Sequence, residues 1–372
     1  VQHRLLLIGG GPMAFIRNDA GNLVPPFGGE AFPWIGGDAQ TIRHFLRRDA
    51  PPPPPSREVL IDLEDGDRLL AAFHPARSNP ETGKTGAAGS RVKTASRGCI
   101  IAVHGLNGCM DAQHILWLVE PVLAAGFSLL RVNMRGAGPA RPLARGTYNA
   151  GAGADLIPFI DAAARLDPDT PLFIMAHSLG GTAALNMILD YPAAAQRLRG
   201  LVAIGTPLDM AASAARFHAP RNRLYIRYML AGLKHIAATI PDIDPELYRA
   251  AMAAKSIIEF DDHVTARLAG YADSGAYYAG TSVHQRLQEA TIPVLVLQGS
   301  TDPWLPDEPA LDQPVPAGPA DLKDNGAARG DVQVVVTRGG GHVGFHDRQL
   351  NWHIRATLSW CSALAANAGV SA

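Results

Sequence analysis

The strongest constraint on this chain is a serine placed between an apolar strand and a helix. The apolar run Leu172–Met175 leads to Ser178, and a helical pattern begins directly after it. In such a strand–turn–helix unit the positions two before and two after the serine must be small, and the serine oxygen projects above the sheet. Those positions are Ala176 and Gly180, so the usual G-x-S-x-G pattern is kept to within one methyl group. The pattern favours a nucleophilic Ser178 over a serine that only caps a buried helix.

Short apolar segments alternate with helical patterns along most of the chain. Strands buried on both faces read as unbroken apolar runs, so this alternation predicts an α/β fold with a mostly parallel sheet and helices on both faces. The first two strands flank the turn signal Glu64–Asp67 and should form an antiparallel hairpin. Eight strands are predicted, near residues 58–63, 68–74, 99–103, 128–132, 172–175, 200–204, 293–298 and 332–337. Helices are predicted near residues 113–124, 152–165, 180–190 and 347–364.

Three kinds of segment are expected. Residues 1–55 are rich in Gly and Pro and should form an arm on the main domain, with a short helix near Gln40–Arg47. Residues 56–206 and 290–372 should form the α/β core. Residues 207–289 lack a buried strand pattern but have helical periodicity, which predicts a helical cap inserted after the sixth strand.

Composition excludes several classes of function. The 372 residues include 33 Lys and Arg against 34 Asp and Glu, a net charge of -1, so no nucleic-acid partner is expected. Three cysteines without a C-x-x-C pair favour a reducing compartment. No apolar run approaches the ~18 residues of a membrane span, and no secretory leader is recognisable, so we expect a cytoplasmic protein without an integral membrane segment.

Neither a cofactor nor a metal is expected. The run Gly9–Gly11 resembles a dinucleotide-binding loop, but Pro12 follows and no helix of useful length opens there. Asp261–Asp262–His263 could suggest a metal site, yet three adjacent side chains do not converge on one ion without further ligands.

A serine nucleophile needs a base and an acid that orients the base. In serine hydrolases built on a parallel sheet these follow in the order Ser, Asp or Glu, His, at strand ends. Asp302 follows the strand at 293–298 and is the predicted acid. Asp209, after the sixth strand, is the rival, and Asp307 is a weaker third.

The predicted base is His342. It follows the last strand, and the glycines around it let the backbone bring an imidazole over the serine. His346 should lie further into the loop, and the side chain of His177 should point away from Ser178. The loop His104–Gly108 after the third strand supplies one backbone N–H, at Leu106, and Leu179 after the nucleophile supplies the second, which together form an oxyanion hole. His104 should hydrogen-bond to hold this loop.

These motifs occur within a wider pattern that resembles the embryogenesis-associated, YheT-like branch of the α/β-hydrolases. The elbow departs from that branch with Ala176–His177 where Gly and an aromatic residue are common, and the acid segment has a single Asp302 where two are common. Pro33–Trp34 with Gln40–Thr41 is similar to the N-terminal arm of the family. Other matching segments are His104–Gly108, Arg131–Gly136, Tyr148–Gly151 with Asp155, Phe260–Asp262, Val264–Ala266, Gly270–Asp273, Tyr277–Tyr278 and Gly340–Phe345.

The resemblance implies an α/β-hydrolase fold and a serine hydrolase that cleaves small-molecule carboxylic esters, with acyl or lipid-like groups, through an acyl-enzyme. An acyltransferase or ester synthase would use the same triad, and a catalytically silent binding protein of this fold is the remaining alternative. In the cap, the apolar stretch Leu224–Leu233 either packs in the core or lines an acyl pocket.

Overall fold

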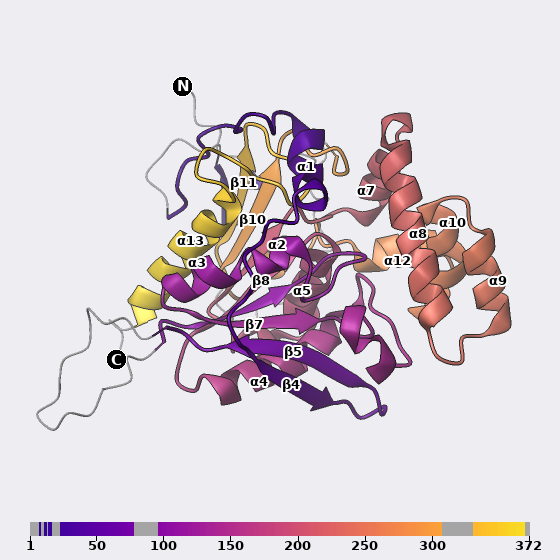
Figure 1. Ribbon diagram of the computed structural model, residues 1–372, viewed down its shortest axis with the longest axis horizontal. Coiled ribbons are helices and arrows are strands. Elements are labelled where there is room, and N and C mark those ends of the chain that lie inside the picture. The colour runs from indigo at the N-terminus through magenta and orange to yellow at the C-terminus, as the bar shows by residue number, and fades with distance from the viewer. Residues whose placement is uncertain are drawn as a thin grey trace, which may run out of the picture.

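The computed structural model describes residues 7–8, 11–12, 14–16, 23–77, 96–306 and 330–368, with side chains from residue 23 to 366 (Figure 1). The strands are β1 (Leu7–Ile8), β2 (Gly11–Pro12), β3 (Ala14–Ile16), β4 (Arg57–Asp62), β5 (Arg68–His74), β6 (Cys99–Val103), β7 (Ser128–Asn133), β8 (Leu172–His177), β9 (Gly200–Ile204), β10 (Val294–Gly299) and β11 (Val332–Thr337).

One sheet organises the molecule, in the strand order β3-β11-β10-β9-β8-β6-β7-β5-β4. The β4–β5 and β5–β7 pairs are antiparallel, which confirms the predicted hairpin, and the remaining pairs are parallel. All eight predicted strands are present. The sheet nevertheless has nine strands, because the short β3 from the N-terminal region pairs with β11 at the edge.

The helices are α1 (Gly37–Leu46), α2 (Gln113–Leu116), α3 (Val119–Ala124), α4 (Ile157–Leu166), α5 (Leu179–Asp190), α6 (Pro192–Ala195), α7 (Met210–Phe217), α8 (Arg223–Thr239), α9 (Pro245–Ala253), α10 (Ile257–Phe260), α11 (Ala266–Leu268), α12 (Ser274–Thr281) and α13 (Trp352–Ala368). Short turns of tighter or wider helix are η1 (Gly138–Leu143), η2 (Ala152–Leu156), η3 (Pro220–Asn222), η4 (Asp261–Thr265) and η5 (Leu287–Glu289).

Three predicted helices differ from the observed ones. The helix expected near 113–124 is split into α2 and α3, because Pro121 has no N–H for a continuous helix and is tolerated only in a first turn. The helix expected near 152–165 opens with the tighter turn η2. The last helix begins at Trp352 and not at Asp347, since Leu350 and Asn351 adopt positive φ angles in a turn before it.

Helices cover both faces of the sheet, as predicted. On one face α4 and α5 pack on the sheet through buried residues that include Phe159, Ile160 and Leu185. On the other face α2, α3 and α13 pack against it, and Trp352 and Trp360 are the largest side chains of that layer. The central strands are buried throughout, which explains their unbroken apolar sequences.

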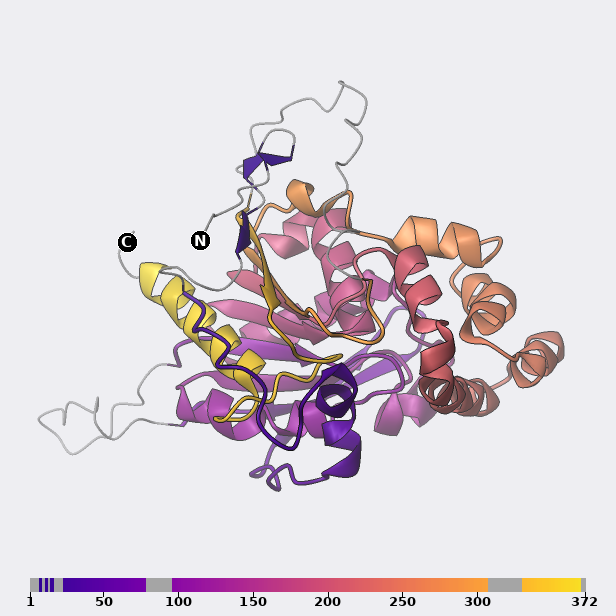
Figure 2. The same ribbon diagram turned by 90° about the horizontal axis from the view of Figure 1, so that it is seen from above.

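The segment between β9 and β10 forms α7 to α12, which gather at one end of the sheet (Figures 1 and 2). Helices α8, α9 and α10 share an apolar cluster that includes Met229, Leu233 and Phe260, whereas Tyr277 and Tyr278 of α12 pack into the core beside the sheet. Helix α1 contacts α8 through the rings of Phe45 and Tyr228, whose centroids lie 5.4 Å apart. Within the described residues, every helix is too short or too polar to cross a membrane.

Candidate active site

Ser178 occupies the sharp turn between β8 and α5. Its φ of 51° and ψ of -127° lie in a region that side-chain-bearing residues rarely adopt, as a nucleophile elbow requires. The Ser178 N–H donates to the Ile204 carbonyl at 2.9 Å, which ties the turn to β9. A Cβ on Gly180 would lie 2.1 Å from the His104 carbonyl oxygen, and one on Gly105 would lie 2.8 Å from the Ser178 Cβ. Only glycines allow the two loops this approach.

The three predicted side chains form one hydrogen-bonded series. The Ser178 Oγ and the His342 Nε2 lie 2.7 Å apart, and the His342 Nδ1 lies 3.0 Å from the Asp302 Oδ2. The Asp302 Oδ1 accepts from the N–H groups of Trp304 at 2.8 Å and Leu305 at 3.2 Å, so both carboxylate oxygens are used. Asp302 and His342 are buried. This arrangement fixes the tautomer with Nδ1 protonated, which leaves Nε2 to accept the serine proton.

The predicted oxyanion donors lie beside the serine. Among the described residues, no acceptor is paired with the backbone N–H of Leu106 or of Leu179. His104 holds the first of these loops, as predicted: its Nδ1 lies 2.8 Å from the Gly105 carbonyl oxygen, and its Nε2 accepts from the Met134 N–H at 3.1 Å. Burial lowers the pKa of His104 to about 4, so the ring is neutral and can accept through Nε2.

The alternative candidates for the acid and the base have other hydrogen-bond partners. Asp209 caps α7, where its carboxylate accepts from the Ala212 N–H at 2.9 Å. The His177 Nδ1 lies 3.1 Å from the Val103 carbonyl oxygen, and the backbone N–H of His346 donates to Gln40 at 2.6 Å. Asp307 falls outside the described residues.

Asp261 and Asp262, which could have suggested a metal site, each accept hydrogen bonds from other residues of the chain. The Asp261 carboxylate accepts from the Tyr278 hydroxyl at 2.8 Å, and Asp262 accepts from the Ser274 N–H at 2.9 Å. Burial raises the pKa of Asp261 to about 6. In the described part of the chain no group of three such side chains could hold a metal ion.

Helix α1 supports the His342 loop, a role that the sequence analysis missed. The Thr41 Oγ1 accepts from the His342 N–H at 2.7 Å and donates to the Gly37 carbonyl at 2.7 Å. The Gln40 side chain accepts from the His346 N–H at 2.6 Å and donates to the His346 carbonyl at 3.0 Å. The family resemblance pointed to Gln40–Thr41, but no local pattern indicated what these residues contact.

Trp304 is the second residue that was missed. Its ring lies over the His342 imidazole, with centroids 4.2 Å apart and planes inclined by 31°. The sequence put this tryptophan two residues after the acid, and a side chain so close to Asp302 could have been expected near the base.

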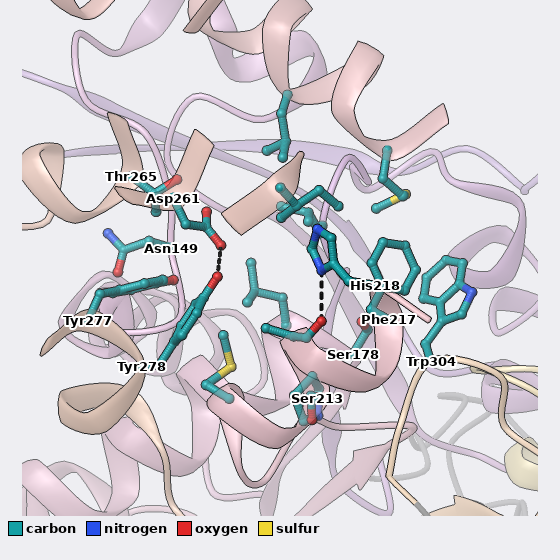
Figure 3. A pocket seen from close by; sticks show the side chains of 18 of the residues that line it. Asn149, Ser178, Ser213, Phe217, His218, Asp261, Thr265, Tyr277, Tyr278 and Trp304 are labelled. Atoms are coloured by element: carbon teal, nitrogen blue, oxygen red, sulfur yellow. Dashed lines mark hydrogen bonds between the residues drawn. The ribbon is translucent and has the colours of Figure 1, made fainter. Parts of the chain in front are cut away.

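Two cavities meet at Ser178 and His342. The first, of about 130 Å³, is lined by residues between β9 and β10, where the cap was predicted, and is called the cap-side chamber (Figure 3). Most of its walls are apolar, and Asn149, Asp261 and Thr265 add polar groups. The apolar wall includes Leu106, Met210, Phe217, Met229, Leu233 and Ile257. The arm-side chamber, of about 340 Å³, lies against α1, α2 and the loop after β6. Both chambers are lined by Ser178 and His342.

The sheet order, the elbow and the order of Ser178, Asp302 and His342 define an α/β-hydrolase. Residues 94–349 match the family described as serine aminopeptidase, S33, and the chain belongs to this family. The match spans β6 to β11 and includes Ser178, Asp302 and His342.

Relatives confirm the predicted YheT-like, embryogenesis-associated branch. The chain is 26% identical to the phospholipase ABHD3 of Mus musculus over 84% of this chain and 71% of that protein. It is 27% identical to the putative esterase YheT of Escherichia coli over 66% of this chain and 70% of that protein. A soluble variant of monoglyceride lipase from Saccharomyces cerevisiae has a similar fold, with a TM-score of 0.51, 14% identity and coverage of 84% and 99%. By class, the chain is a carboxylic ester hydrolase.

Thr41→Val removes the oxygen that accepts the His342 N–H while keeping the shape of the side chain. We expect kcat for ester cleavage to fall roughly 10- to 100-fold, because a small misplacement of the base is costly. The free energy of unfolding should fall by about 1–3 kcal/mol for the unpaired buried N–H. Thr41→Ser keeps the oxygen and should stay near wild type. Steady-state kinetics and urea unfolding test both variants, and equal activity of the Val and Ser variants would contradict the role of the hydroxyl.

Proposed function

We propose that the protein hydrolyses carboxylic esters through an acyl-enzyme formed on Ser178. The observation that carries this proposal is the hydrogen-bonded series from the Ser178 Oγ through His342 to Asp302. His342 takes the serine proton through Nε2 as the oxygen attacks the ester carbonyl, and then gives the proton to the departing alcohol oxygen. Asp302 stabilises the imidazolium through Nδ1–H. Water, activated by His342 in the same way, then cleaves the acyl-serine.

Leu106 and Leu179 act through their backbone N–H groups. Negative charge develops on the carbonyl oxygen in the tetrahedral intermediate, and N–H groups fixed beside Ser178 stabilise it without reorganising. The glycine contacts between the two loops support this arrangement, because they hold the Leu106 loop against the first turn of α5.

The cap-side chamber is proposed to bind the acyl chain. Helices α7, α8 and α10, from the proposed cap at 207–289, supply six of its apolar side chains. Burial there is worth about 0.8 kcal/mol per methylene group, so an acyl chain gains affinity with each carbon until the chamber is full. In the stretch Leu224–Leu233, Met229 and Leu233 line the chamber and Leu230 is buried in the apolar cluster of these helices, whereas Leu224 is exposed.

The relatives are consistent with an acyl or lipid-like ester as substrate, since their names include a phospholipase, an esterase and a medium-chain fatty acid ethyl ester synthase/esterase. Acyl transfer to an alcohol would use the same residues and differ only in the group that attacks the acyl-serine. The complete triad argues against a silent binding protein.

Ser178→Ala should lower kcat by about 10⁶, because the acyl-enzyme can no longer form. The fold should survive, since within the described residues the Ser178 hydroxyl makes one hydrogen bond, to His342. Turnover of a nitrophenyl ester and labelling by a fluorophosphonate test this expectation. Activity within tenfold of wild type in a folded variant would refute the proposed nucleophile.

Asp302→Asn should lower kcat by roughly 10⁴, because the asparagine favours the wrong tautomer of His342. Asp209→Asn is the matched control: asparagine caps a helix as well as aspartate does, so α7 and kcat should be unchanged. The two variants are compared by kcat at a fixed pH. A larger loss at position 209 would assign the acid to the loop after β9.

Ala214→Leu should shorten the longest acyl chain that the enzyme accepts. Ala214 lies on α7 and lines the cap-side chamber, so a leucine there occupies space otherwise open to the acyl chain. The next residue on the helix gives the control, because Ala215 is exposed and Ala215→Leu should leave the chain-length profile unchanged. Values of kcat/KM for a series of linear acyl esters test this. An identical profile for both variants would exclude the chamber as the acyl site.

A further inference from the structure

The loop between β6 and α2 contacts α8 through a side chain that has no part in the proposed reaction. Leu106 of this loop packs against both the core beside the sheet and the apolar cluster of α8, α9 and α10. It also lines the cap-side chamber together with Met229 of α8. The peptide group proposed to bind the oxyanion therefore stands at the boundary between two parts of the fold.

On the side of the sheet, the loop is held through one carbonyl group. The Gly105 carbonyl oxygen accepts from the Gly108 N–H at 3.1 Å and lies 2.8 Å from the His104 Nδ1. This carbonyl and the Leu106 N–H belong to the same planar peptide group, so holding the oxygen also directs the N–H. A tight turn results, with Leu106 and Asn107 at its centre.

On the side of α8, the loop is held by Asn107. Its φ of 57° lies in the left-handed region, which asparagine and glycine tolerate best at this position of a turn. The Asn107 Nδ2 donates to the Met229 carbonyl at 2.9 Å, across 122 positions of the chain. A glycine would satisfy the backbone equally well, so the turn alone does not account for the side chain. What the side chain adds is the bond to α8.

Further along α8, Gly232 makes room for this amide. Gly232 and Met229 are three residues apart and therefore lie on the same face of the helix. A Cβ on Gly232 would lie 2.3 Å from the Asn107 Nδ2 and 2.6 Å from its Cγ, far inside normal contact distance. Glycine weakens a helix interior in comparison with alanine. The helix thus has a less stabilising residue at the point where the Asn107 amide docks.

We propose that Asn107 is a positioning residue that fastens the oxyanion loop (His104–Gly108) to α8, so that the Leu106 N–H points at the reacting carbonyl oxygen only while α8 is docked. The inference rests on ester hydrolysis at Ser178. When the Ser178 Oγ bonds to the carbonyl carbon, its proton moves to His342 and the carbonyl π electrons move to the oxygen. The N–H stabilises that charged oxygen more than the neutral carbonyl, so its direction affects kcat more than KM.

Asn107→Gly keeps the left-handed backbone and removes the bond to α8. We expect kcat for nitrophenyl octanoate to fall about 10-fold, a part of the roughly 10²–10³ that loss of a whole oxyanion donor costs, while KM changes little. Octyl trifluoromethyl ketone adds to the serine as a tetrahedral oxyanion, and its Ki should rise by the same factor as kcat falls. Asp169→Gly is the matched control, because Asp169 has a φ of 61° in an exposed turn before β8 and its replacement should leave kcat unchanged.

Gly232→Ala perturbs the same contact from the helix. The added methyl group displaces the Asn107 amide, so kcat should again fall about 10-fold with KM nearly unchanged. In the Asn107→Gly background the space is free, and Gly232→Ala should then have no further effect on kcat. This double-mutant cycle measures the coupling between the loop and α8. Each variant also tests the contact by itself if the other fails to fold.

Urea unfolding separates positioning from a merely structural role, which would lower the unfolding midpoint without a matching change in the Ki of the ketone. Wild-type values of kcat and Ki in folded Asn107→Gly would overturn the proposal. A Gly232→Ala effect that persists without the Asn107 side chain would overturn it as well. Both results would leave ester hydrolysis at Ser178 intact. A wild-type protein that neither cleaves nitrophenyl octanoate nor binds the ketone would refute the proposed function, and the role of Asn107 would fall with it.

Discussion

The site depends on the contact between the elbow and the loop after β6. Ser178 has unusual backbone angles, and the first turn of α5 that follows it lies against the His104 carbonyl. Gly180 and Gly105 are the residues that permit this approach. The contact places the N–H groups of Leu106 and Leu179 next to Ser178. One steric requirement, small residues at two positions, thereby brings the Ser178 hydroxyl and the unpaired N–H groups of Leu106 and Leu179 together.

The sheet brings the remaining groups to the same edge. Parallel strands all end on one side, so the segments after β6, β8, β10 and β11 meet there although they are far apart in the chain. Asp302 comes after β10 and His342 after β11, and these strands are neighbours in the sheet. The His342 Nδ1 therefore lies near the Asp302 Oδ2, at 3.0 Å. The helices between β9 and β10 and the N-terminal helix α1 lie at this edge, and the two cavities beside Ser178 are lined by these helices on one side and by α1 on the other.

Sequence reasoning was most successful where local patterns reflect local physics. The elbow, the buried strands and the order of Ser178, Asp302 and His342 are each encoded within a few residues. Boundaries were less accurate at Pro121, whose missing N–H splits a helix, and before Trp352, where two residues with positive φ delay the start of α13. The short β3 was missed because its pairing with β11 is a long-range contact without a sequence signature. The contacts of Thr41 and Trp304 with His342 likewise arise from tertiary packing.

The link between Thr41 and His342 has a consequence for how the enzyme matures. These two residues are 301 positions apart, and the Gln40–His346 bonds span 306. Loop-closure entropy makes such distant contacts among the slowest to form, so partly folded states that already contain the elbow would still lack a positioned base. Ester cleavage would therefore appear only when the two ends of the fold have docked. In a refolding experiment, catalysis would then report the final native contacts, whereas the helical signal would report earlier ones.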